Sequence, residues 1–239
     1  MPILKTYSLD GGASVPSRGP RRTSGDVGSR DGVWRTIGGW AATGAGVAGL
    51  LGLLSVIPWP ELFAIDARPI NAITRRPGLK YVLVGHYAIL VAGGVLGSVA
   101  GVGLVLARRR RFVHLLGGLL LAGASAAFAY AATVRTIDLS DGRAVEDVEG
   151  VVWAGGGVLL IAVVILTLAL RRHAGTSFLL LGLGAPVLVV AGIATFMLVG
   201  PDFYPEIWGV TFPPPSDYLL AIWFVGLGRV MRTTATGTV

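Results

Sequence analysis

Residues 81–107 read YVLVGHYAILVAGGVLGSVAGVGLVLA, and four arginines, Arg108 to Arg111, follow them directly. The stretch contains no Asp, Glu, Lys or Arg, and it exceeds the roughly 18 consecutive apolar residues that mark a membrane-spanning helix. An arginine run is the expected stop at a membrane surface, because moving arginine into hydrocarbon is costly. Residues 81–107 therefore predict a transmembrane helix.

Similar apolar stretches recur along the chain. We predict spans near 37–57, 81–107, 112–134, 151–170, 177–199 and 218–231. The last is weaker, since about 14 residues rise roughly 21 Å in a helix, against a hydrocarbon core of about 30 Å. The predicted fold class is all-α, a polytopic integral membrane helical bundle with six transmembrane helices, or five if the last segment does not cross.

The composition supports a membrane protein. The chain is 53% hydrophobic and 14% charged with a mean hydropathy of +0.72, whereas a soluble domain carries roughly 25% charged residues. Its net charge is +7, but the basic residues form short clusters at the ends of apolar segments and not one polar face, so we expect no nucleic-acid partner. The absence of cysteine excludes disulfides and thiolate sites in this sequence.

The two ends of the chain differ from its middle. Residues 1–33 are rich in Gly, Ser, Arg and Pro without apolar periodicity, so we predict a disordered cytoplasmic tail. Residues 34–232 form the predicted bundle, and 233–239 form a short C-terminal tail.

Orientation follows from the basic clusters. Placing the N-terminus in the cytoplasm also places there the arginines at 108–111, at 171–172 and at the C-terminus, as the positive-inside rule favours. One loop, 58–80, opposes this assignment, because it carries Arg68, Arg75, Arg76 and Lys80 yet lies outside. We predict a cell-membrane protein with both termini cytoplasmic.

Small residues recur four apart on two predicted spans. They are Gly93, Gly97 and Gly101 on 81–107, and Gly44, Ala48 and Gly52 on 37–57. Residues four apart share a helix face, and small ones let helix backbones approach closely in lipid. Such faces serve either a homodimer seam or packing within the bundle, and the second is the favoured interpretation.

Candidate site residues lie near the predicted outer ends of the spans. They are His86, Asp138, Asp202 and Glu206. Three histidines invite a haem or metal interpretation, but His86 lies near the outer side whereas His114 and His173 lie near the inner side. No catalytic motif or phosphate-binding loop is present, so we predict no cofactor, no metal and no catalytic set.

The first five predicted spans contain no Asp, Glu, Lys or Arg, which weakens an interpretation as an ion pump. The leading hypothesis is a non-enzymatic scaffold or accessory subunit. The alternative is a transporter or carrier of an uncharged or apolar solute, and a third possibility is an interfacial enzyme acting on lipid. Expected partners are the lipid bilayer and either a membrane-protein partner or further copies of the chain.

Overall fold

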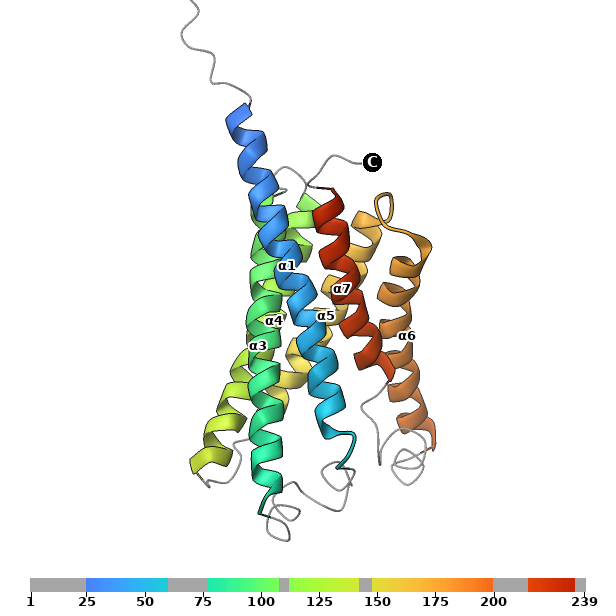
Figure 1. Cartoon of the computed structure of the whole chain (residues 1–239). Coiled ribbons are helices and arrows are strands. Elements are labelled where there is room, and N and C mark those ends of the chain that lie inside the picture. The colour runs from blue at the N-terminus through green and yellow to red at the C-terminus, as the bar shows by residue number, and fades with distance from the viewer. Residues whose placement is uncertain (1–24, 60–76, 108–111, 142–147, 200–214, 235–239) are drawn as a thin grey trace, which may run out of the picture.

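The computed structural model describes residues 25–59, 77–107, 112–141, 148–199 and 215–234 (Figure 1). Every regular element in these ranges is an α-helix, which confirms the predicted all-α class. The helices are α1 (Gly25–Val56), α3 (Leu79–Ala107), α4 (Phe112–Asp141), α5 (Glu149–Leu170), α6 (Thr176–Val199) and α7 (Pro215–Thr233). Five of them, α1 and α3 to α6, are long and apolar enough to cross a membrane.

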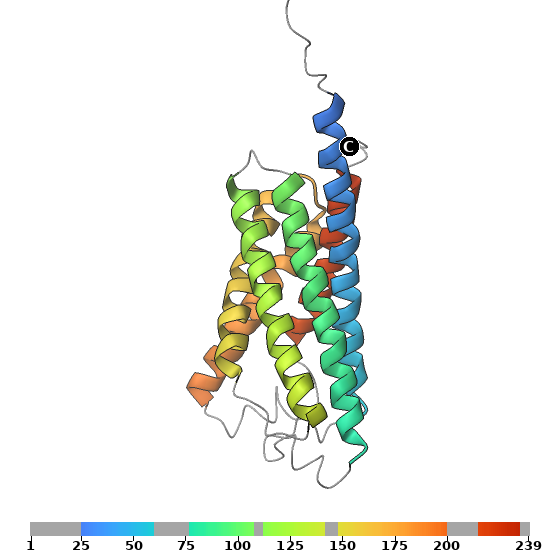
Figure 2. The same cartoon turned by 90° about the vertical axis from the view of Figure 1, so that its left-hand side faces the viewer.

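The main packing contacts close the helices into a ring. Helix α3 packs between α1 and α4, α5 packs between α4 and α6, and α7 returns between α6 and α1 (Figures 1 and 2). Apolar side chains fill the inside, including those of Leu121, Leu166, Trp223 and Leu227, which are fully buried. The predicted helical membrane bundle is therefore what the described residues form.

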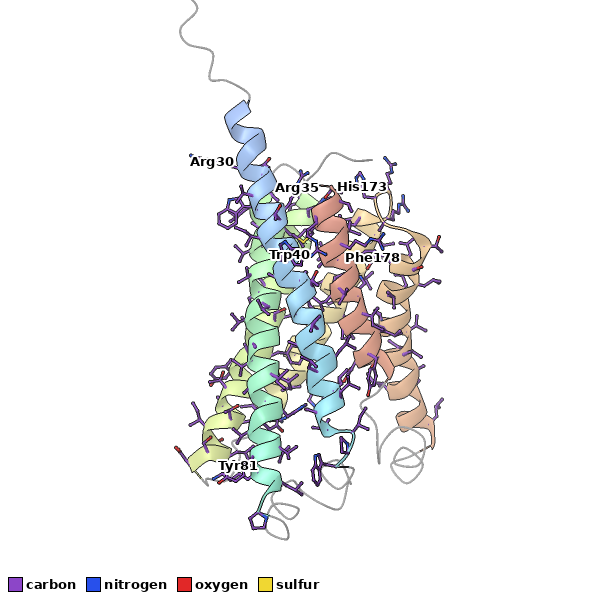
Figure 3. The ribbon with its side chains drawn as sticks, viewed as in Figure 1. Arg30, Arg35, Trp40, Tyr81, His173 and Phe178 are labelled. Atoms are coloured by element: carbon purple, nitrogen blue, oxygen red, sulfur yellow. The ribbon has the colours of Figure 1, made fainter. Side chains whose placement is uncertain are left out.

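The two ends of the bundle carry different residues. The start of α1, the turn between α5 and α6 and the end of α7 lie together, with Arg30, Arg35 and His173 labelled there in Figure 3. We call this the basic end, since Arg171 and Arg232 also lie on these segments. Tyr81, at the start of α3, marks the opposite end (Figure 3).

Helix α1 begins earlier than its predicted span. It starts at Gly25, inside the segment 1–33 that the composition predicts as a tail, and it projects past the other helices at the basic end (Figure 1). The spacing of Asp31 and Arg35, four residues apart, is one that favours a helix in the sequence. An acid four residues before a base supports a helix by about 0.2–0.5 kcal/mol per pair.

Helix α4 extends beyond its predicted end at 134 to Asp141. The hydroxyls of Thr133, Thr136 and Ser140 each donate to the carbonyl four residues earlier, at 2.7, 2.7 and 2.8 Å. These hydroxyls find acceptors on their own helix, so α4 continues through them beyond the apolar segment. The extension brings Asp138 onto a helix instead of a loop.

Helix α7 is the sixth helix of the described chain. Pro215 opens it, where a missing amide hydrogen costs nothing and the fixed φ suits a first turn. It packs against α1 and α6 and so closes the ring. It is not among the five helices whose length and composition suit a membrane span. Asp217, Arg229 and Arg232 account for its lower hydropathy.

Candidate functional site

His86 connects two helices near the opposite end of the bundle. Its Nδ1 lies 3.0 Å from the Gly52 carbonyl oxygen and 3.4 Å from the Ser55 hydroxyl, both on α1. Because a carbonyl oxygen only accepts, the contact with Gly52 places the proton on Nδ1. The Ser55 hydroxyl donates to the same carbonyl at 2.7 Å. His86 thus ties α3 to α1 through a backbone acceptor.

An aromatic and cationic contact continues from His86 toward α4. The Tyr87 ring meets the His86 ring edge-on at 5.2 Å between centroids, and the Arg135 guanidinium carbon lies 5.7 Å from the Tyr87 centroid. The Arg135 Nε is buried without a hydrogen-bond partner. A cation over a tyrosine face is attracted by the ring quadrupole, so this contact holds α3 against α4.

Asp138 is the second candidate that the structure places. It lies on α4, three residues after Arg135, and only 8% of its surface is exposed. The contacts of His86 described above are with Gly52, Ser55 and the Tyr87 ring. The other two candidates, Asp202 and Glu206, lie outside the described residues.

Among the described residues, no group of three or more His, Asp or Glu side chains could hold a metal ion. Of the other histidines, His114 is 2% exposed on α4, and His173 is exposed in the turn after α5.

A buried polar pair inside the ring, toward its basic end, was not anticipated from the sequence. The Trp223 indole nitrogen on α7 donates to the Thr167 hydroxyl on α5 at 2.9 Å, and both residues are 0% exposed. The Phe178 ring stacks on the indole, with 5.6 Å between the ring centroids. Gly182 leaves room for the pair, because a Cβ at that position would meet both the Thr167 oxygen and the Trp223 nitrogen. The sequence signal for this pair was Thr167, a polar residue inside an apolar span. A single hydroxyl in the sequence does not indicate which residue it will contact.

A second unanticipated site is at the basic end, between α1 and α7. Arg232 Nη1 donates to the Thr43 hydroxyl at 2.8 Å and to the Gly39 carbonyl at 3.3 Å. Its guanidinium carbon lies 4.1 Å from the centroid of the Trp40 ring. Arg35 on α1 donates in the other direction, to the Thr234 carbonyl at 2.8 Å. We call these contacts the arginine seam.

The small residues singled out in the sequence all face other helices of the same chain. A Cβ at Gly101 would lie 2.6 Å from backbone atoms of Ala122 and Gly118 on α4. At Gly97 the neighbour is the Ser125 side chain of α4, and at Gly93 it is Ala48 of α1. On α1, the glycines at 44 and 52 face leucine side chains of α3. Helix α3 uses two faces, one for each neighbour.

No protein-family model matches the chain, and neither a curated protein nor a solved structure shows significant similarity to it. Its helices identify it as a multi-pass, membrane-type helical protein.

Proposed function

We propose that the protein is a non-enzymatic scaffold or accessory subunit of a membrane assembly. The observation that supports this most directly is the filled inside of the ring, toward the basic end. Trp223 is fully buried there, with its one polar hydrogen taken by Thr167 and its ring packed on Phe178 and Phe224. A carrier needs a solute path that opens to either side, whereas packed side chains fill the inside of this ring. A self-satisfied aromatic core is better suited to holding a fixed shape.

The outer surface is available to lipid or to a partner. Helix α6 is the least buried of the five apolar helices, and Leu180, Val187 and Val190 on it are 69%, 64% and 65% exposed. Helix α1 also exposes apolar residues, such as Leu51 at 52%. An accessory subunit would use one such face for a partner and leave the rest to lipid.

Photo-crosslinking in native membranes tests the proposal. A photoreactive residue replaces Val187 on α6 in one variant and Leu51 on α1 in a matched variant. We expect one of these faces to cross-link a single protein in constant proportion, either a second copy of the chain or another membrane protein. Lipid adducts alone from both positions would remove the scaffold proposal.

The carrier and enzyme alternatives have their own readouts. Saturable uptake of an uncharged solute by proteoliposomes of the purified protein would favour the carrier. For the lipid-acting enzyme, His86 and Asp138 are the candidates that lie within the described residues, and the Nδ1 of His86 is in contact with the Gly52 carbonyl. Turnover of a phospholipid that is lost in His86→Gln would favour that enzyme over the scaffold.

A further inference from the structure

The arginine seam leaves cationic hydrogen-bond donors without protein acceptors. The Nη1 of Arg232 donates to the Gly39 carbonyl and to the Thr43 hydroxyl, and these two bonds use both hydrogens of that nitrogen. The hydrogens on its Nε and Nη2 have no acceptor among the described residues. These two nitrogens are not buried. These donors therefore lie at an accessible edge of the guanidinium.

The partners that the structure gives this guanidinium are all uncharged. They are a backbone carbonyl, a hydroxyl and the Trp40 ring. The neighbouring Arg35 is likewise bonded to a carbonyl, that of Thr234. Two arginines thus join α1 and α7 in one seam, and within the described chain the contacts given above for their guanidinium groups are with uncharged groups. A cation in an apolar setting is costly until an anion or water satisfies it.

The seam opens toward lipid. Trp40 is 63% exposed even with Arg232 on its ring, and Trp34, on the same helix, is 38% exposed. Indole rings prefer the headgroup level of a membrane, where one side is apolar and the other is wet. Figure 3 shows Trp40 on α1 below Arg35, on the bundle side of the projecting turns. The arginines thus lie at headgroup depth when α1 spans a membrane.

We propose that the arginine seam binds the phosphate of an anionic phospholipid in the leaflet at the basic end. The free Nε and Nη2 edge of Arg232 suits two oxygens of a phosphate, because a guanidinium donates in parallel through adjacent nitrogens. Arg35 adds positive charge from α1, and the exposed part of Trp40 packs on the glycerol and first acyl carbons. Basic sites between membrane helices are where lipid headgroups are recognised by charge.

Binding of phosphatidylglycerol and phosphatidylcholine to the full-length protein in neutral detergent tests this site. We expect the wild type to prefer phosphatidylglycerol by about tenfold, and Arg232→Gln to lose most of that preference. The matched control is Arg172→Gln, an exposed arginine at the same end that makes the same change in charge. Equal preference in the two variants would overturn the proposal. Inorganic phosphate at matched ionic strength should not displace the lipid, and displacement would show that a free anion is the ligand.

A second measurement does not depend on recovering Arg232→Gln. Bromine on the upper acyl carbons quenches tryptophan on contact, so brominated phosphatidylglycerol should quench the wild type more than brominated phosphatidylcholine does. Trp40→Phe should abolish this excess, because the headgroup bound at Arg232 places the chain beside Trp40. An excess that persists unchanged in Trp40→Phe would place the anionic lipid elsewhere and overturn the proposal.

Discussion

The α3–α4 interface and the junction of α5, α6 and α7 hold their helices together in different ways. Along α3, glycines bring backbones together, and a Cβ at Gly101 would lie 2.6 Å from the Ala122 nitrogen. At the junction, the large Trp223 side chain fills the space between helices, contacting Thr167 on α5 and Phe178 on α6. One interface depends on missing side chains and the other on a large one.

The difference shows that glycine content does not by itself indicate close packing. Helix α5 carries three consecutive glycines, yet a Cβ at Gly157 would meet nothing within 4 Å. Gly101 on α3 looks no different in the sequence, since both lie inside uninterrupted apolar stretches. Only the neighbouring helix determines whether a glycine is required.

The largest effect is expected from Trp223→Ala. Removing a fully buried tryptophan side chain leaves a cavity and an unused Thr167 hydroxyl, so we expect the free energy of unfolding to fall by about 3–5 kcal/mol. Titration of the detergent-solubilised protein with a denaturing detergent measures it. Trp153→Ala is the control, because that ring is 71% exposed, and its effect should stay near 0.5 kcal/mol. Similar losses in both would contradict a tryptophan-filled junction.

Two glycine-to-alanine changes are expected to alter the stability of the protein in opposite directions. Gly101→Ala must push α4 away, because the atoms it meets are backbone, and overpacking of this kind costs about 1–3 kcal/mol. Gly157→Ala enters open space on a helix and should be neutral or stabilising by up to about 1 kcal/mol. Thermal unfolding in one detergent compares the two variants. If Gly101→Ala also proved stabilising, the close approach of α3 and α4 would be disproved.

The local part of the fold was predictable from the sequence. A helix in lipid satisfies its own backbone hydrogen bonds, so an uncharged apolar stretch specifies it without reference to its neighbours. For this reason the predicted 81–107 and 151–170 lie within two residues of the observed α3 and α5. The start of α1 was missed because its first turns are polar and lie beyond the apolar stretch.

The lateral contacts were not predictable in the same way. Trp223 and Thr167 are 56 residues apart, and Arg232 and Thr43 are 189 apart, so no local pattern links either pair. His86 was selected for its depth and type, but its partner Gly52 was noted only as a small residue for helix packing. Side-chain chemistry marks a candidate, whereas the partner depends on which helices become neighbours.

The smallest effects on stability are expected from removing one hydroxyl in each region. The Ser98 hydroxyl on α3 shares its one hydrogen between two carbonyl oxygens, that of Gly94 on its own helix at 2.9 Å and that of Ala122 on α4 at 3.2 Å. Thr167 is instead the hydrogen-bond acceptor for the buried Trp223 indole. Hydrogen bonds between membrane helices average about 0.6 kcal/mol, whereas a buried donor left without an acceptor costs about 1–3 kcal/mol.

We therefore expect Ser98→Ala to lower the free energy of unfolding by about 0.5 kcal/mol, because both carbonyls that it contacts belong to helices and keep their backbone partners. Thr167→Val, which keeps the shape but removes the acceptor, should cost about 1–2 kcal/mol. Combining Thr167→Val with Trp223→Phe removes donor and acceptor together, so the double variant should lose less than the sum of the single variants. Additive losses would mean that the indole finds another acceptor, and a Ser98→Ala loss as large as that of Thr167→Val would remove the distinction between the two regions.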